Sequence, residues 1–293
     1  MADNFTFIIS TGRTGTQFLG DLMSRAIEDC HSEHEPDVFH GFDAVSFQRL
    51  REFGLWHMLI GRALGQSGVR VLGTRYLNGQ ISLDRATGKL RDQRARFHAS
   101  VPQGLLIESY GSWWMFAREL GDIFPGSKSI GLIREPHAWI ESVRSHLAGF
   151  HGRPGGVLAH RLPPGPLTAE SVGDARWADK WDKLSQIGQL AWQWSYAYSV
   201  MDDAVQMGNM TMYRFEEVFD PKTDALSRLC NDASSFPDKS YTVGSTEGLL
   251  SNRRNASSAQ KDAWQNWSDD DLALVEEMCA PLMARYGYQS VRS

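Results

Sequence analysis

The chain has 293 residues, of which 42% are hydrophobic and 22% are charged, and its formal net charge is −5 at pH 7. This composition predicts an ordinary globular protein with a substantial core, most simply one domain with a lid. The acidic balance argues against a generic nucleic-acid binder and against a protein held on anionic lipid, because both need clustered positive charge. Any anionic ligand must therefore meet a local basic site.

The cysteines and the N-terminal segment bear on the compartment. Cys30, Cys230 and Cys279 are odd in number and widely spaced, which fits neither a disulfide framework nor a zinc site. The apolar run from Phe5 to Ile9 follows no basic segment and is too short for a signal sequence or a membrane span. We therefore expect a cytoplasmic protein with neither a membrane nor a nucleic acid as partner.

Short apolar runs alternate with helix-like stretches along the chain. Phe5 to Ile9 ends in Ser10-Thr11-Gly12 and precedes apolar residues at helical spacing, which predicts a strand, a tight loop and a helix. Further strands are predicted at Val69 to Leu72, Leu105 to Ile107, Ile130 to Ile133 and Asn209 to Tyr213. Buried strands that alternate with helices predict an α/β fold with a doubly wound, mainly parallel sheet.

The second half of the chain predicts one long loop and two long helices. Residues 149–166 are rich in glycine and proline without hydrophobic periodicity, and we expect a lid or acceptor loop over residues 149–176 within a single domain, 1–293. Trp177 to Met207 has helical periodicity, and its aromatic face is expected to pack on the core. Asp269 to Tyr286 predicts a terminal helix that Ser268 caps and Gly287 ends.

The loop after the first strand is the first motif with chemical meaning. Ser10 to Leu19 is rich in small residues and opens a helix, so its backbone N–H groups and Arg13 are suited to hold an anion. It is not a Walker A loop, because Gly15 precedes Thr16 and Gln17 where that motif needs lysine and then serine or threonine. The alternative is a glycine turn with solvated polar residues.

A second motif lies where the strand at Ile130 to Ile133 ends. Arg134-Glu135-Pro136 precedes a predicted helix, and Pro136 suits its first position. Arg134 and Ser142, two turns into the helix, are both placed to approach a phosphate near the carboxyl edge of the sheet. The alternative is a surface salt bridge of Arg134 with Glu135 or Glu141.

Together, the two motifs resemble the bacterial-type sulfotransferases that use 3′-phosphoadenosine 5′-phosphosulfate (PAPS). The resemblance implies a P-loop-like sulfotransferase fold, in which Arg13, Thr14, Gly15 and Thr16, with Gln17 and Phe18, wrap the 5′-phosphosulfate. It also implies that Arg134 and Ser142 bind the 3′-phosphate. The implied activity is transfer of a sulfuryl group from PAPS to a hydroxyl or amine, with adenosine 3′,5′-bisphosphate as the other product.

Two later segments extend the resemblance. Tyr213 to Val218 is similar to the family's segment near the adenine, with Phe215 in place of the usual tyrosine, which keeps a ring for stacking but loses the phenol. Arg253 and Arg254 stand where the family has a basic loop that closes over the nucleotide, but the glycine after the basic pair is absent. Which arginine reaches a phosphate is left open, with a solvated basic turn as the alternative.

The reaction needs a general base to take the acceptor's proton. His34-Glu35-Pro36 follows the first helix, and the loop after a second strand would lie at the same edge as the phosphate loop. Tyrosylprotein sulfotransferases resemble this arrangement, so Glu35 is the preferred base and His34 the second candidate. Cytosolic sulfotransferases use a histidine after a later strand, where this chain has Glu108. The alternative is that Glu35 only caps a turn before the proline.

The remaining expectations concern metals, the acceptor and other functions. The histidines show no metal-binding spacing, so we expect no metal site. The acceptor is expected to be a small molecule, bound by the segments from Phe39 to Arg62 and from Tyr76 to Val101 and by the lid. The aromatic side chains that suggest a partly apolar pocket, and that are equally suited to a core, are Phe42, Phe47, Phe53, Trp56, Trp113 and Trp114. The alternatives are a P-loop-like small-molecule kinase, which needs magnesium-dependent ATP turnover, and a nucleotide-binding module without catalysis.

Overall fold

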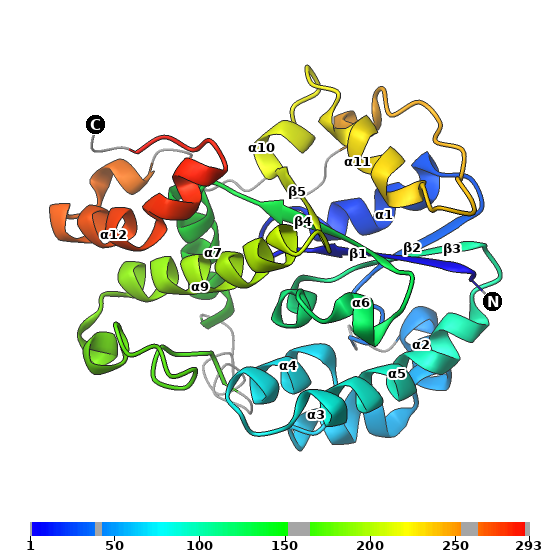
Figure 1. The fold of residues 1–293 in the computed structure, drawn as a ribbon, viewed down its shortest axis with the longest axis horizontal. Helices are drawn as coiled ribbons and strands as arrows, with labels where there is room; N and C mark the ends of the chain where they lie inside the picture. Colours follow the sequence, from blue (N-terminus) through cyan, green and yellow to red (C-terminus); the bar gives the residue numbers. More distant parts are fainter. Residues whose placement is uncertain (1, 39–42, 152–164, 253–262, 291–293) are drawn as a thin grey trace.

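A parallel β-sheet forms the centre of the computed structural model, which describes residues 2–38, 43–151, 165–252 and 263–290 (Figure 1). Within these ranges the sheet has five strands in the order β2-β3-β1-β4-β5. The strands are β1 (Asn4–Ile9), β2 (Cys30–His34), β3 (Leu105–Ser109), β4 (Lys128–Ile133) and β5 (Thr211–Arg214), and each neighbouring pair is parallel. The predicted α/β class with a doubly wound parallel sheet is confirmed.

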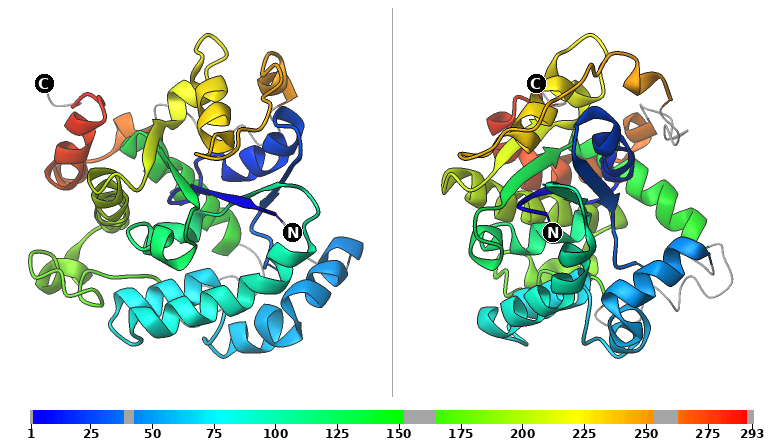
Figure 2. Two further views of the ribbon diagram at one scale, coloured as in Figure 1. Left: turned by 45° about the vertical axis from the view of Figure 1, so that its right-hand side comes forward. Right: turned by 90° about the vertical axis from the view of Figure 1, so that its right-hand side faces the viewer.

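Helices cover both faces of this sheet (Figures 1 and 2). In the described ranges they are α1 (Thr16–Ala26), α2 (Ala44–Phe53), α3 (Gly61–Ala63), α4 (Val69–Leu77), α5 (Leu83–Ser100), α6 (Leu120–Ile123), α7 (Pro136–His151), α9 (Gln186–Gln206), α10 (Phe215–Val218), α11 (Ala225–Ser234) and α12 (Asp269–Arg285). Figure 1 shows α1, α10 and α11 above the sheet, with α6, α9 and the layer from α2 to α5 below it. None of these helices is long and apolar enough to cross a membrane.

The alternation of side chains along β1 explains how two layers share one sheet. Phe7 and Ile9 join the large core cluster that includes the buried face of α9, while Ile8 joins the cluster formed with α1 and α11. All three are almost fully buried. Successive residues of a strand point to opposite faces, so the uninterrupted apolar run from Phe7 to Ile9 is typical of a central strand that is covered on both faces.

The predicted strand at Val69 to Leu72 is wrong, because these residues open α4. The apolar residues are buried as expected, but they lie on a helix: Val69, Val71 and Leu72. In the same helix, Gly73 packs directly against Met115. A β carbon at Gly73 would come within 2.6 Å of the Met115 sulfur. Tertiary packing has here overridden the preference of β-branched residues for strands.

Two other boundaries differ from the prediction. The helix predicted from Trp177 begins only at Gln186, where the Ser185 side chain accepts a hydrogen bond from the Gly188 N–H, and residues 178–183 form a 3-10 helix. Helix α7 continues to His151 into the predicted loop, and residues 152–164 lie outside the described residues. The C-terminal helix is confirmed, with Ser268 accepting from the Asp271 N–H.

Candidate functional site

The loop between β1 and α1 is held by donors that bind its carbonyl groups. Trp139 Nε1 donates to the Gly12 carbonyl at 3.0 Å, Arg134 Nη1 to the Arg13 carbonyl at 2.7 Å, and the Ser109 hydroxyl to the Thr16 carbonyl at 2.7 Å. These donors come from α7, the end of β4 and β3. The loop carbonyls are therefore bound by the surrounding protein, which leaves the opposite side of the peptide groups to face a ligand.

The N–H groups of this loop are suited to an anion. The φ angles of Gly12, Arg13 and Gly15 are 77°, 56° and 77°, so the loop turns tightly before α1 begins at Thr16. Within the described residues, the N–H groups of Arg13, Thr14 and Gly15 donate no hydrogen bond. The Thr14 hydroxyl is buried and also has no partner there. Such groups usually find a partner, so their number fits a bound phosphate or sulfate.

The second motif meets this loop directly. Arg13 Nε donates to the Ser142 hydroxyl at 3.2 Å, and Ser142 is 1% exposed. Arg134 bonds the loop carbonyl described above, and its guanidinium lies 4.7 Å from the ring centroid of Phe215. Three residues predicted to bind the donor's phosphates are thus brought together around one loop, from segments that are more than a hundred residues apart in sequence.

The two acidic neighbours of Arg134 have other partners. Glu135 accepts from the His137 N–H at 3.1 Å, from the Ala138 N–H at 2.7 Å and from the His137 ring, so it caps α7. Burial raises the pKa of Glu135, but these hydrogen bonds together lower it by a larger amount, so the net shift of the pKa is downward. Glu141 accepts from Arg144 and from Trp267. The conformation at the end of β4 is therefore fixed by a helix cap.

An aromatic cluster lies beside the loop on the α10 side. The rings of Phe215 and Phe219 lie 4.8 Å apart, and those of Phe18 and Phe219 lie 5.7 Å apart. Phe215 is 8% exposed, and its ring packs against the Arg134 guanidinium. Gln17 lies exposed in the first turn of α1. Arg253 and Arg254 lie outside the described residues.

The two candidate bases lie at the carboxyl end of β2, at the same edge of the sheet. Glu35 has a φ of 47°, and its N–H donates to the Ser109 carbonyl at 3.3 Å. His34 Nδ1 is 2.8 Å from that same carbonyl, and its Nε2 is 3.9 Å from Glu35 Oε1. Since a carbonyl only accepts, Nδ1 carries the proton and Nε2 has the lone pair. Burial lowers the pKa of His34 although the hydrogen bond to Ser109 raises it, so the ring is neutral at pH 7.

A buried ionic network begins two residues after Glu35, at Asp37, and holds the loop that contains Glu35. Asp37 Oδ2 is 2.9 Å from His57 Nε2 and 3.1 Å from Arg94 Nη1. Arg94 Nε also bonds Glu108 at 3.1 Å, and His98 bonds Glu108 at 2.9 Å. Burial raises the pKa of Asp37, but the charges of Arg94, Arg62 and His57 and the hydrogen bond to His57 together outweigh burial, which keeps the pKa well below its usual range. Glu108 is therefore a structural ion-pair partner and does not stand in for the family's later histidine.

Several residues of the site were not predicted. Trp139 and Ser109 hold the loop carbonyls, and Tyr198 accepts from the Thr11 hydroxyl at 3.1 Å while it donates to the Leu132 carbonyl. Trp139 and Tyr198 lie in helices, where an aromatic residue normally indicates only core packing. Their polar atoms were the available signal, because a buried indole N–H or phenol needs a partner.

The aromatic side chains proposed for the acceptor divide between core and surface, apart from Phe42, which lies outside the described residues. Phe53 and Trp113 are buried, while Phe47 and Trp56 are 53% and 54% exposed. Trp114 is half-buried against Tyr196, with ring centroids 6.0 Å apart. The predicted pocket is therefore not a single aromatic cluster.

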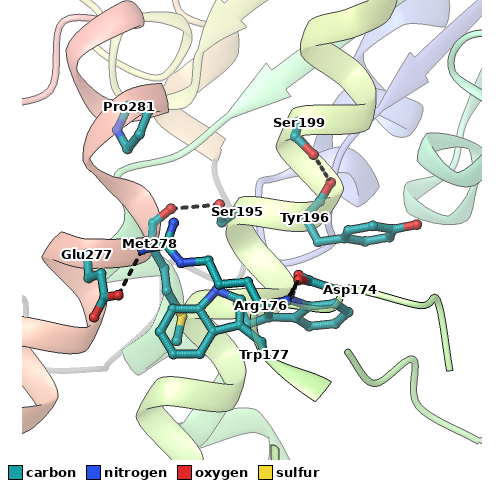
Figure 3. A pocket seen from close by; sticks show the side chains of 10 residues that line it. Asp174, Arg176, Trp177, Ser195, Tyr196, Ser199, Glu277, Met278 and Pro281 are labelled. Atoms are coloured by element: carbon teal, nitrogen blue, oxygen red, sulfur yellow. Dashed lines mark hydrogen bonds and ion pairs between the residues drawn. The ribbon is translucent and has the colours of Figure 1, made fainter. Parts of the chain in front are cut away.

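A cavity of about 270 Å³ lies away from this loop, between α9, α12 and residues 174–177 (Figure 3). Trp177, Trp192 and Tyr196 form its aromatic side, and Arg176 and Glu277 form an ion pair at its edge. Trp192 donates to Asp174 at 2.7 Å. Its polar groups are paired with each other, so it does not resemble a site for a phosphorylated nucleotide. In the described part of the chain, no group of three or more His, Cys, Asp or Glu is placed to hold a metal ion.

No protein-family model and no curated protein matches the chain. Three solved structures are similar to it over nearly the whole length. A sulfotransferase from Alicyclobacillus acidocaldarius is 14% identical, with 99% of this chain and 98% of that chain covered and a TM-score of 0.47. A sulfotransferase domain from the curacin biosynthetic pathway is 14% identical, with 98% of both chains covered and a TM-score of 0.41.

The third structure is a sulfotransferase domain from the Synechococcus PCC 7002 olefin synthase, 17% identical, with 94% of both chains covered and a TM-score of 0.43. All three identities are below 20% and all three TM-scores below 0.5. The function proposed below therefore rests on the residues of the site. These three structures are sulfotransferases or sulfotransferase domains.

Proposed function

We propose that the chain is a sulfotransferase that transfers a sulfuryl group from PAPS to a hydroxyl or amine of a small-molecule acceptor. The observation that carries the proposal is the contact of Arg13 with Ser142, 129 residues apart, beside a loop in which the N–H groups of Arg13, Thr14 and Gly15 find no acceptor among the described residues. A glycine turn with solvated polar residues would need neither the buried Thr14 hydroxyl nor three donors on the loop carbonyls.

The site contains two groups of residues, one for each of the two phosphate positions of the donor. The N–H groups after Gly12, the Thr14 hydroxyl and Arg13 would hold the 5′-phosphosulfate at the start of α1, where the helix dipole favours an anion. Arg134 and Ser142 would hold the 3′-phosphate. Because ATP has no 3′-phosphate, this second contact would distinguish PAPS from ATP.

The proposed reaction is an in-line displacement at sulfur. The acceptor oxygen or nitrogen forms a bond to sulfur while the bond from sulfur to the 5′-phosphate oxygen breaks. The acceptor's proton goes to the base, and the bonding electron pair stays on the departing 5′-phosphate. Arg13 and the loop N–H groups would stabilise that charge as it develops, and this scheme needs no metal.

Either Glu35 or His34 is placed to take the proton, and the rate against pH separates them. If His34 is the base, activity is lost as the pH falls below the pKa of its ring, which burial holds under the usual value of about 6.5. A carboxylate base keeps its activity to about pH 4–5. We propose Glu35, so Glu35→Gln should abolish transfer while His34→Gln retains the acid limb of wild type. If the acid limb of the pH–rate profile disappears in His34→Gln, His34 and not Glu35 is the base.

Calorimetric titration with adenosine 3′,5′-bisphosphate, without magnesium and with ATP as competitor, tests the donor site. We expect binding that survives a chelator and exceeds that of ATP by at least about tenfold, because a charge-assisted phosphate contact contributes about 1.5–3 kcal/mol. Arg134→Ala should remove that preference, and Arg144→Ala, which alters a partly exposed arginine of α7 that is paired with Glu141, serves as the control. Binding of ATP alone, and only with magnesium, would contradict the proposal.

A further inference from the structure

Arg62 joins the loop after β2 to the residue that follows β3. Its Nη1 donates to the Asp37 carbonyl at 2.8 Å, and its Nη2 donates to the hydroxyl of buried Tyr110 at 3.2 Å. A guanidinium group is planar and rigid, so two donors of one group fix the distance between their two acceptors. Arg62 therefore holds two separate segments of the chain at a defined separation.

The first of these segments is the turn that carries the candidate base. Asp37 is two residues after Glu35, and the Val38 N–H closes the turn by donating to the Glu35 carbonyl at 3.0 Å. Glu35 has a φ of 47°, in the left-handed region that a residue with a side chain rarely adopts. Such a conformation persists only where the surrounding structure holds it. The contacts of this turn therefore determine where the Glu35 carboxylate lies.

The second segment lies against the phosphate loop. The Tyr110 N–H donates to the Ile8 carbonyl at 3.0 Å, in the strand that leads into that loop. The next residue, Gly111, packs on the loop itself, because a β carbon there would be 3.3 Å from the Gly12 nitrogen. Arg62 thus links the turn of the candidate base to the segment that packs on the donor loop.

An uncommon helical turn brings Arg62 to this position. Residues Trp56–Ile60 form a π-helix, a turn whose hydrogen bonds join residues five apart. His57 and Arg62 have this spacing, and both reach Asp37, one at its carboxylate at 2.9 Å and the other at its carbonyl. In an α-helix, residues five apart point about 140° away from each other. The π turn therefore allows both side chains to hold one residue, and such turns are frequent at functional sites.

The two groups of Asp37 are held by different partners. Its carboxylate is paired with Arg94 at 3.1 Å and with His57 in the buried network. Arg62 binds the main-chain carbonyl of the same residue and so acts on the backbone that carries Glu35. Loss of Arg62 would leave the ion pairs of Asp37 in place and would free the turn of the candidate base from the segment after β3.

We propose that Arg62 is a positioning residue, which sets the Glu35 carboxylate against the donor loop through its hydrogen bonds to Asp37 and Tyr110. The inference rests on the proposed sulfotransferase function and adds to it a residue outside the two phosphate motifs. Loss of this link slows transfer without weakening donor binding, because other residues hold the phosphate loop. A misplacement of a reacting group by about 1 Å can slow a reaction by about a hundredfold.

Hydrogen–deuterium exchange of the full chain tests the link without any acceptor. In Arg62→Met, the peptide that contains the Glu35 and Val38 amides should exchange several-fold faster, because both amides are hydrogen-bonded within this turn. Arg75→Met is the matched control, because Arg75 Nη1 donates instead to the Gly65 carbonyl at 3.1 Å, and it should leave this peptide unchanged. Equal exchange of the peptide in wild type and in Arg62→Met would overturn the inference.

Transfer assays with labelled PAPS test the effect on the reaction. Phenols, alcohols and amines are offered together, and kinetics are measured with the acceptor that wild type sulfates fastest. Arg62→Met should lower kcat by about 10- to 100-fold and leave KM for PAPS within about twofold of wild type, while Arg75→Met should retain kcat. Arg62→Lys keeps the charge but not the planar fork and should not restore kcat. Wild-type kcat in either variant of Arg62 would overturn the positioning role.

A double-mutant cycle tests the route through Tyr110. Tyr110→Phe removes one of the two acceptors of Arg62, so it should lower kcat by a smaller factor than Arg62→Met does. The double variant should be no slower than Arg62→Met, because the bond is already lost in that variant. Losses that multiply in the double variant would refute this route.

The binding, exchange and transfer measurements separate this inference from the function beneath it. If adenosine 3′,5′-bisphosphate fails to bind in calorimetry but Arg62→Met still speeds exchange in the turn, the sulfotransferase proposal fails and the link between the two segments stands. If wild type binds the bisphosphate and transfers the label, and Arg62→Met does so at the same kcat, the proposed function stands and the positioning role of Arg62 is refuted.

Discussion

Replacing Gly15 by alanine is the sharpest test of how the phosphate loop is built. Gly15 has a φ of 77°, and a β carbon there would lie 2.4 Å from Phe219 Cζ and 2.7 Å from Phe219 Cε2. Gly12 has the same φ of 77°, but a β carbon there meets nothing within 4 Å. The pair of variants Gly15→Ala and Gly12→Ala therefore separates steric overlap from backbone strain.

The expected magnitudes follow from these two contributions. A left-handed conformation costs an alanine about 1–2 kcal/mol, partly offset by about 0.4–1 kcal/mol from the less flexible unfolded chain. Gly12→Ala should therefore lower the free energy of unfolding by about 1 kcal/mol. Gly15→Ala adds overlap with a packed ring, which costs a further 1–3 kcal/mol or about 2–4 kcal/mol in total.

Urea denaturation of both variants at pH 7 measures the difference by linear extrapolation. Phe219→Leu in the Gly15→Ala background should recover about 1 kcal/mol relative to the sum of the two single changes, since it makes room at the point of contact. Losses for Gly15→Ala and Gly12→Ala that agree within about 0.5 kcal/mol would refute the close approach of the loop to α10.

Three further predictions concern buried groups. Arg94→Met removes the cation shared by Asp37 and Glu108 and should lower the free energy of unfolding by about 3–5 kcal/mol. Arg96→Met, at an exposed position of the same helix, should change it by less than about 0.5 kcal/mol. Equal losses of stability for the two variants in urea denaturation would contradict the network. The pKa values of Asp37 and Glu108 are lowered in the folded protein, so the stability that these two carboxylates contribute is complete above their unfolded pKa of about 4. That stability is lost as the pH falls towards the folded pKa values. Denaturation midpoints that stay constant between about pH 5 and pH 2 would contradict this pH dependence. Burial raises the thiol pKa values, to about 12 for two of them, so Ellman's reagent should react only after unfolding, and rapid reaction of the folded protein would contradict the burial of Cys30, Cys230 and Cys279.

The sequence predicted best those parts of the site whose residues are adjacent in the chain. The strand, loop and helix around Arg13 form one local unit, so the run of small residues and its hydrophobic flanks indicate both the conformation and the chemistry. The edge strand β2 was harder to recognise, because its residues Cys30 to His34 are mostly polar and only partly buried. Hydrophobic periodicity detects burial, and a half-covered strand shows little of it.

The parts that the sequence did not predict depend on packing between distant segments. Val69 to Leu72 has the composition of a strand, and only contact with Met115 makes it a helix. The ionic network joins the segment after β2 to β3 and α5, and no pattern in one segment indicates that Asp37 and Glu108 share a single arginine. Arg253 and Arg254 lie outside the described residues, so their assignment stays a prediction.

The difference between the phosphate loop and the candidate base has a physical origin in this fold. A phosphate can be bound by backbone N–H groups at the start of one helix, so its site is encoded by a short segment such as Gly12 to Thr16. The position of Glu35 depends instead on separate elements, because its N–H donates to the Ser109 carbonyl at the end of β3, and Asp37, two residues later, is paired with Arg94 of α5. Such contacts form only when distant segments pack together, which is why the sequence indicates the phosphate loop more directly than it indicates the base.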